Sequence, residues 1–231
     1  MNIQFFVCFH NRIYHENYHF EEKDKKYITF YGVRDRQNVD RVIYENELAV
    51  YNPHLQKQTY NEGSCLYHVF HNNLYQKYDY IGFAQYDMTF YPDVFRDIER
   101  TLETQPKTIF YIGFFEWAFK GGQSPICHDY DHFTGGLKSY NRFFNTNFVE
   151  KDLIRNKMII CNTFLIPQEL FTKMMSWMNF YFINTISPIM CDQQNQLDFN
   201  PGHMIEALTS MFLSLEIPNG YTYHPLQLRH K

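Results

Sequence analysis

The segment DYIGFAQYDMTFYPD, residues 79–93, decides the fold class of this chain. Residues 80–84 form an unbroken apolar run, which predicts a strand that is buried on both faces. Asp87 follows this strand almost at once, and the Pro-Asp pair at 92–93 predicts the start of a helix. Open α/β sheets bind their ligands at such strand ends, so Asp87 is the first candidate for a functional residue.

Strand and helix patterns alternate along the rest of the chain, with no linker or break in composition. This mixture predicts one α/β domain over residues 1–231, built as a three-layer sandwich with a mostly parallel, mixed sheet between layers of helices. Further strands are predicted at 3–9, 27–33, 108–116 and 158–166, helices at 61–74, 92–103, 167–183 and 203–217, and loops at 34–40, 117–136 and 187–202.

Composition excludes several classes of protein. The 231 residues carry a net charge of -4, so there is no basic field for nucleic acid or for an acidic membrane surface. The five cysteines form no CxxC pair, which favours reduced thiols in a cytosol. The N-terminus lacks a basic region before its short apolar run, and no segment reaches the ~18 apolar residues of a membrane span. We therefore expect a cytoplasmic protein without a transmembrane segment.

Asp87 and Gln85 stand two residues apart on an extended segment, so their side chains leave the same face. Mg²⁺ and Mn²⁺ are held by one or two protein carboxylates, and substrate phosphates and water complete the shell. Asp87 is therefore sufficient as a metal ligand. The pattern leaves open the alternative that Asp87 merely caps a turn.

The stretch His-Asp-Tyr-Asp-His at 128–132 is a second acidic candidate, because Asp129 and Asp131 form a literal Asp-x-Asp. It lies about a dozen residues beyond its predicted strand, among glycines, so a solvated loop is the alternative interpretation. A zinc site through His128 and His132 lacks a third ligand at a recognisable spacing. Asp87 is favoured over Asp129 and Asp131 as the metal ligand because it directly follows a buried strand, although its sequence matches Asp-x-Asp less well.

The predicted helix at 203–217 carries Glu206 as a polar residue among apolar ones. If this edge faces a cleft, Glu206 can act as a base or stabilise a developing cation, and His203 can bind metal or phosphate. If it faces water, both residues belong to an ordinary solvated face. Nucleophile-elbow, GxxxxGK and GxGxxG motifs are absent from the sequence, which disfavours hydrolase, P-loop and dinucleotide-binding functions.

The segment ELAVYNPHLQKQTYNEGSCLYHVFHN, residues 47–72, running into the strand before Asp87, resembles small GT-A glycosyltransferases. The similarity is to DUF4422-type capsular polysaccharide proteins and to the N-terminal glycosyltransferase domain of a chlorovirus capsid-glycosylating enzyme. It rests on four blocks in order, which span most of residues 47–217. These are the Tyr-Asn-Glu helix start at 60–62, the strand ending near Asp87, the CNTFLI segment at 161–166 and the late helix that bears Glu206.

The resemblance implies a GT-A-like fold and a nucleotide-sugar donor, commonly a UDP-sugar, whose diphosphate is bridged by Mn²⁺ or Mg²⁺ to an Asp-x-Asp position. That position reads Gln85-Tyr86-Asp87 here, and the replacement of the first Asp by Gln departs from the usual pattern and is expected to weaken metal affinity. The donor is expected near the first two strand ends, although ordinary turn structure is the alternative there. The matching residues are Phe9, His10, Asn11, Gly32, Val33 and Arg34, with Gln85 and Tyr86 beside the metal.

A glycosyltransferase of this kind moves the sugar to a hydroxyl of a glycan or glycoprotein acceptor, in the host cytoplasm if the protein is viral. An acidic side chain near the anomeric carbon deprotonates the acceptor or stabilises an oxocarbenium-like state, with Glu206 as the first candidate and Asp192 as the second. Two alternatives remain open. One is a noncatalytic carbohydrate-binding protein, and the other is a metal hydrolase that uses the His and Asp side chains at 128–132.

Overall fold

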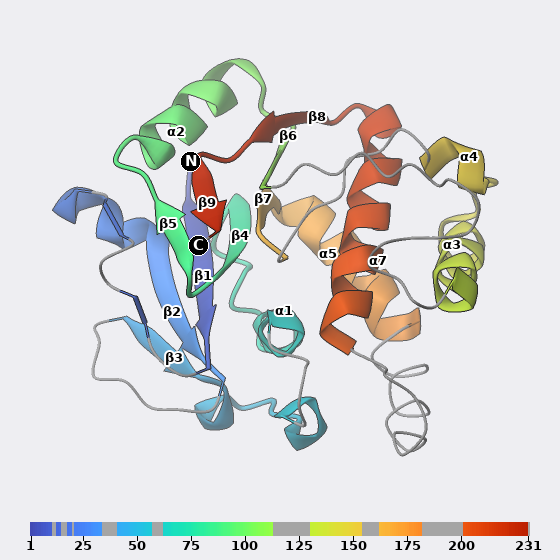
Figure 1. The fold of residues 1–231 in the computed structure, drawn as a ribbon, viewed down its shortest axis with the longest axis horizontal. Helices are drawn as coiled ribbons and strands as arrows, with labels where there is room; N and C mark the ends of the chain where they lie inside the picture. Colours follow the sequence, from blue (N-terminus) through green and yellow to red (C-terminus); the bar gives the residue numbers. More distant parts are fainter. Residues whose placement is uncertain are drawn as a thin grey trace.

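The computed structural model describes residues 1–10, 13–14, 18–19, 21–33, 41–56, 62–112, 130–153, 162–181 and 201–230. A seven-stranded sheet in the order β3-β2-β1-β4-β7-β6-β8 forms its centre (Figure 1). The strands are β1 (Ile3–Phe9), β2 (Ile28–Gly32), β3 (Val42–Tyr44), β4 (Tyr80–Gln85), β6 (Thr108–Tyr111), β7 (Phe164–Pro167) and β8 (Thr222–Pro225).

Four of the six strand pairings in this sheet are parallel: β1 with β2, β1 with β4, β2 with β3 and β6 with β8. β7 runs antiparallel to both of its neighbours, β4 and β6. The prediction of a mixed, mostly parallel sheet is therefore confirmed. β1 and β4 are nearly continuous apolar runs because both faces of each strand are covered.

Helices and a small second sheet cover the two faces of the central sheet. Along β1, Phe6 and Cys8 point to one face and pack with α1 (Glu62–His71), α3 (Tyr130–Phe144), α5 (Gln168–Met178) and α7 (Pro201–Glu216). Phe5 and Val7 point to the other face and pack with α2 (Val94–Thr104). These three layers confirm the predicted sandwich. The short elements are α4 (Glu150–Leu153), η2 (Glu22–Tyr27), η3 (Glu45–Glu47), η4 (Pro53–Gln56) and η6 (Ile217–Asn219).

Helix α3 corrects one expectation from the sequence. Residues 117–136 were predicted to be a loop, but residues 130–136 belong to α3. The glycine pair that suggested a flexible loop serves close packing instead, because a Cβ on Gly136 would lie 2.7 Å from Cδ2 of Leu208 on α7. A Cβ on Gly135 would lie 2.7 Å from the hydroxyl of Tyr181. Within the described ranges, no helix combines the length and the apolar content that crossing a bilayer requires.

A two-stranded antiparallel sheet, which the sequence did not predict, forms from β5 (Met88–Phe90) and β9 (Leu228–His230). β5 begins directly after Asp87, and Met88 pairs with His230. Phe90 is fully buried, with its ring centroid 5.8 Å from that of Phe5 in β1. The chain segment that follows Asp87 is thus fixed by pairing on one side and by core packing on the other.

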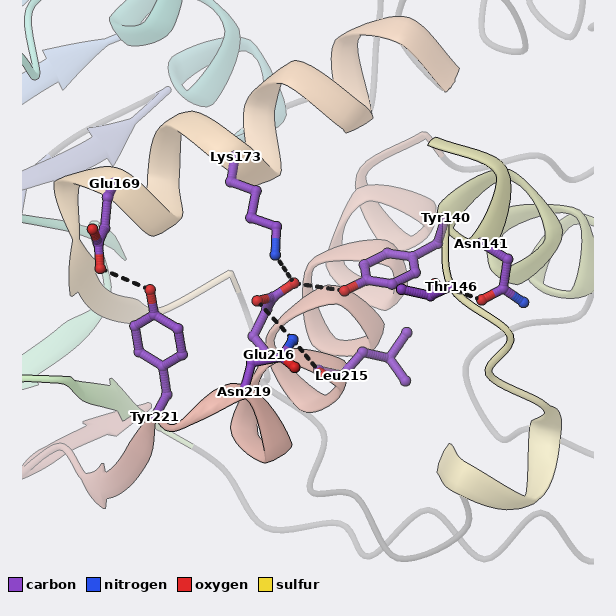
Figure 2. Close-up of polar contacts among 9 residues, drawn as sticks. All are labelled: Tyr140, Asn141, Thr146, Glu169, Lys173, Leu215, Glu216, Asn219 and Tyr221. Atoms are coloured by element: carbon purple, nitrogen blue, oxygen red, sulfur yellow. Dashed lines mark hydrogen bonds and ion pairs between the residues drawn. The ribbon is translucent and has the colours of Figure 1, made fainter. Parts of the chain in front are cut away.

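Glu216, at the end of α7, joins three helices through a buried polar cluster (Figure 2). Its side chain is 1% exposed, and its Oε1 accepts hydrogen bonds from the Tyr140 hydroxyl of α3 and from Lys173 Nζ of α5, each at 2.6 Å. Asn219 Nδ2 donates to Oε2 at 3.2 Å. Glu216 therefore ties the packing of α3 and α5 to the end of α7.

Candidate functional site

The carboxyl ends of β1, β2 and β4 meet at one edge of the sheet, and the predicted donor residues lie there. Phe9 pairs with Gly32, and Cys8 pairs with Gln85. The Val33 amide donates a hydrogen bond of 2.9 Å to the Phe9 carbonyl just beyond the strands. The structure thus brings Phe9, Gly32, Val33 and Gln85 to one place, while their role in donor binding stays a prediction.

Gly32 allows close packing of side chains at this edge, next to β3. A Cβ at this position would lie 2.7 Å from Cδ1 of Tyr44 and 3.0 Å from Cζ of Phe9. Real Cβ atoms essentially never come within 3.0 Å of another heavy atom, so any larger residue at position 32 would force the Tyr44 ring to move from its present packing.

Aromatic rings form one wall beside the strand ends. The rings of His10 and Tyr86 meet edge-to-face with centroids 4.9 Å apart, and Tyr14 stacks on Tyr86 at 5.5 Å. The Tyr18 hydroxyl donates to the Tyr86 carbonyl at 3.1 Å, so the backbone of this residue is held as well. Burial, with Asp87 and Tyr14 close by, raises the pKa of Tyr86, which keeps its hydroxyl protonated at neutral pH. Stacked rings of this kind can receive a base or a sugar ring.

Asp87 lies in the turn between β4 and β5, so the backbone on both sides of it is fixed by strand pairing. Its side chain is half-buried, and its Oδ1 atom is shielded from solvent. α2 has Asp93 as its N-cap residue and takes no side-chain cap hydrogen bond. The backbone of Asp87 is thus fixed at the strand end, and the role of its carboxylate as a metal ligand stays a prediction.

Glu62, at the start of α1, is an acidic residue of this site that the sequence analysis missed. It is 7% exposed, and burial raises its pKa to about 7. The charges of Glu206 and Asp87 raise this pKa further, whereas hydrogen bonds from its own backbone and from the Gln85 side chain lower it. Glu62, Asp87 and Glu206, called here the acidic group, therefore lie close enough to interact electrostatically, and Gln85 bonds to one member.

The acidic group forms because the start of α1 packs closely against α7 at Ile205. A Cβ on Gly63 would lie 2.3 Å from Cδ1 of Ile205, so glycine permits this close approach. Glu62 precedes Gly63 and Glu206 follows Ile205, so the same approach brings the two glutamates near each other. Glu206 is half-buried, and the Ser210 hydroxyl donates to its carbonyl at 2.9 Å. Glu206 is thus half-buried beside other acidic residues, and its role stays a prediction.

A buried hydrogen-bond network fixes α1 from its inner side. Glu45 Oε2 accepts a 3.0 Å hydrogen bond from the Ser64 hydroxyl and lies 3.3 Å from Nδ1 of His68. His68 Nε2 accepts a bond from the Asn52 amide at 3.1 Å, which assigns the ring proton to Nδ1. Because Ser64 bonds to Glu45 and not to His68, and all three side chains are buried, the network positions α1 and is not a hydrolytic triad.

The acidic group offers the oxygen donors that Mg²⁺ and Mn²⁺ prefer, and a cation would offset the repulsion that raises the pKa of Glu62. Within the described ranges, no three His, Cys, Asp or Glu side chains stand close enough to hold a metal by themselves. The residues therefore fit a cation whose remaining ligands come from substrate phosphates and water, and they do not form an all-protein metal site.

Several predicted site residues lie outside the described residues: Asn11, Arg34, His128, Asp129 and Asp192. The backbone of His203 lies in the first turn of α7, near Glu206. The backbones of Asp131 and His132 lie in α3. The structure thus tests neither the metal site proposed at 128–132 nor the role of Asp192.

Solved structures share this architecture at low sequence identity. The WbbM bifunctional glycosyltransferase matches with a TM-score of 0.55 and 12% identity over 99% of this chain. This chain covers 45% of WbbM, so it spans less than half the length of that protein. The galactosyltransferase LgtC, in complex with donor and acceptor sugar analogs, has a TM-score of 0.38 and 9% identity, with 85% of this chain and 62% of LgtC covered.

The mannosyltransferase Ktr4p from S. cerevisiae has a TM-score of 0.38 and 10% identity, with 99% of this chain and 70% of Ktr4p covered. No protein-family model and no curated protein sequence matches this chain. The likeness to WbbM, together with the sheet order, shows that the fold is GT-A-like.

The raised pKa of Glu62 predicts a pH-dependent loss of stability. Its carboxyl changes from an ordinary pKa of 4.5 to about 7 on folding, so the folded state holds this proton more tightly. As pH rises from about 4.5 to above 7, wild-type protein should therefore lose on the order of 3 kcal/mol of unfolding free energy relative to Glu62→Gln. Urea unfolding of both proteins at several pH values measures this difference. The exposed Glu103→Gln variant should follow wild type, and parallel curves for wild type and Glu62→Gln would contradict the prediction.

Proposed function

We propose that this chain is a metal-dependent glycosyltransferase that moves a sugar from a nucleotide-sugar donor to a hydroxyl of a glycan or glycoprotein acceptor. A UDP-sugar is the first donor to test, and the cytoplasm is the proposed location. The supporting observation is that the acidic group stands at the carboxyl edge of the sheet in a GT-A-like fold, beside the strand ends and the aromatic wall. Ligands of open α/β sheets bind at such an edge.

In this proposal Asp87 binds Mn²⁺ or Mg²⁺ together with the donor's phosphates, and His203, three residues before Glu206 in the sequence of α7, is the second proposed ligand. A cation at this position supplies charge compensation for the departing nucleoside diphosphate. Tyr86 and Tyr14 offer stacked rings for the base. The nucleotide is proposed to lie at the ends of β1 and β2, where Phe9 pairs with Gly32. The proposed donor residues are Phe9, His10, Asn11, Gly32, Val33 and Arg34, of which Asn11 and Arg34 lie outside the described residues.

Glu206 is the proposed base or cation-stabilising group, with Asp192 as the second choice. Glu62 is a further candidate for the catalytic acid or base, because a carboxyl with a pKa of about 7 can gain or lose its proton at neutral pH. Gln85, hydrogen-bonded to Glu62, orients that carboxyl. The stereochemical outcome depends on which of these side chains reaches the anomeric carbon.

Calorimetric titration of the folded protein with UDP and UDP-sugars, with and without Mn²⁺, tests the proposal. Saturable binding that requires Mn²⁺ and is lost in EDTA is the expected result. The absence of any saturable signal at millimolar nucleotide, with a native circular dichroism spectrum, would overturn it.

A noncatalytic carbohydrate-binding protein is the second candidate, because Gln85 stands where a first carboxylate is expected and an aromatic wall borders the strand ends. Glycan binding that persists in EDTA and is unchanged in Asp87→Ala would favour this alternative. A metal hydrolase based on residues 128–132 would be ruled out if metal content survives replacement of His128, Asp129, Asp131 and His132.

A further inference from the structure

A cavity of about 570 Å³ opens on the same sheet, away from the candidate site. Thr29, the second residue of β2, lines it, whereas the candidate site begins at the other end of that strand, at Gly32. Another part of its wall is the segment 73–78, which ends just before β4 begins. The cavity therefore lies toward the amino ends of strands whose carboxyl ends form the candidate site, and its volume falls within the range of small-molecule sites.

The inner surface of this cavity is apolar and the outer part is polar. Phe6 and Thr29 are buried on the inner side, and Tyr78 is half-buried and contributes an aromatic ring. Asn73 and Gln76 are exposed, and Gln76 Nε2 donates a 2.9 Å hydrogen bond to Asn73 Oδ1. This bond does not use the side-chain NH₂ of Asn73 or the side-chain Oε1 of Gln76, which are a donor and an acceptor.

Two cations, Arg41 and Lys77, carry the charge of the lining, and no carboxylate is among the described residues that line the cavity. Arg41 Nη1 donates to the Lys25 carbonyl at 2.6 Å, which fixes the guanidinium. Lys77 Nζ lies 5.1 Å from the centroid of the Tyr78 ring. In a chain with a net charge of -4, a cavity with only positive charge favours an anionic ligand.

The backbone of Arg41 adds a further observation at this position. Its φ of 56° lies in the left-handed region, which an arginine rarely occupies. Its carbonyl accepts a 2.9 Å hydrogen bond from the Phe30 amide, so β2 holds this conformation in place. Strained backbone that the surrounding structure enforces is found preferentially at ligand-binding positions.

We propose that this cavity binds an acidic saccharide, such as a uronic acid or a phosphorylated sugar. The sugar ring lies against Tyr78 and the apolar inner surface, and its hydroxyls bond to the amides of Asn73 and Gln76. Its carboxylate or phosphate is held by Arg41, which can bond two oxygens at once, and by Lys77. The proposal does not rest on the proposed glycosyltransferase function, because it concerns binding at a separate surface.

Titration of the full chain with glucuronate, glucose 6-phosphate, glucose and inorganic phosphate, in EDTA, tests this site. Both acidic sugars should bind saturably, at least about tenfold more tightly than glucose or inorganic phosphate, because charge and ring are recognised together. Arg41→Gln and Lys77→Gln should each weaken binding of the acidic sugars about tenfold. The exposed cations Arg142 and Lys138 on α3 supply the matched controls, and their glutamine variants should bind like wild type.

Three results would overturn the proposal: no saturable binding of either acidic sugar, equal affinity for inorganic phosphate, or unchanged affinity in the Lys77→Gln variant. Lys77→Gln decides the matter if Arg41→Gln unfolds, because Lys77 is exposed and its loss leaves the backbone bonds of β2 intact. Mn²⁺-dependent UDP binding should be the same in Lys77→Gln as in wild type, so failure at this cavity is distinguishable from failure of the glycosyltransferase proposal.

Discussion

Replacing Asp87 with alanine should lower kcat/KM for sugar transfer by about 10²- to 10³-fold and abolish Mn²⁺-dependent UDP binding. The expected loss is large because, in the proposed mechanism, this single carboxylate connects the protein to the cation that compensates the leaving diphosphate. Gln85, at the other position of the motif, carries no charge and cannot replace it. The measurement is initial rates with the best UDP-sugar found by titration, together with calorimetry of UDP and Mn²⁺.

Asp93→Ala is the matched control for Asp87→Ala. Asp93 is an exposed acidic residue on the same segment and pairs with Arg96 at 2.7 Å. Its loss should leave both rate and nucleotide binding close to wild type, since exposed ion pairs contribute little. If Asp87→Ala folds normally and still binds UDP in a Mn²⁺-dependent manner, Asp87 is not the metal ligand.

Replacing Glu216 with alanine should lower the unfolding free energy by about 3 kcal/mol. The side chain of Glu216 bonds to Tyr140, Lys173 and Asn219, none of which belongs to the candidate site. The variant removes the carboxylate that accepts hydrogen bonds from both Tyr140 and Lys173. The buried Tyr140 hydroxyl and the partly buried Lys173 ammonium then lose this acceptor. Lys173 is 38% exposed, so water can solvate its ammonium group in the variant. The expected loss of unfolding free energy is therefore at the lower end of the range for breaking a buried ion pair. Urea unfolding at neutral pH measures this change.

Glu169→Ala on α5 tests whether burial causes the effect of Glu216. Glu169 is exposed and accepts a 2.8 Å hydrogen bond from the Tyr221 hydroxyl, so its loss should cost less than about 1 kcal/mol. Figure 2 shows the two carboxylates from neighbouring helices. Similar losses in both variants would mean that the buried cluster stabilises the helices no more than a surface contact does.

The sequence predicts the centre of the sheet well for a physical reason. Strands β1 and β4 are covered on both faces, so burial requires continuous apolar runs that can be recognised without any partner. Helix α3 escaped prediction because its Gly135–Gly136 pair has the composition of a loop. Its role in close packing becomes visible only once Leu208 of α7 and Tyr181 are in place.

The candidate site was predictable only in part for a related reason. The position of Asp87 follows from local pattern, because a strand end and a helix start bracket it. Glu62 could not be recognised, since a glutamate in the first turn of a helix is ordinary. Its raised pKa arises from burial and from Glu206, which is far along the sequence, and only the packing of α1 against α7 brings the two together.

The pairing of β5 with β9 has a consequence for the order of folding. β5, the strand after Asp87, can pair with β9 only when residues 228–230 are present, because Met88 pairs with His230. Contacts between residues so far apart in sequence form late, because closing a long loop is slow. The parallel strands β1 and β2 are much closer in sequence and can pair before residue 230 has been synthesised. The turn that carries Asp87 therefore gains its β9 support only after residues 228–230 have been synthesised, and an alteration at 228–230 should leave the sheet folded but weaken the order of this turn.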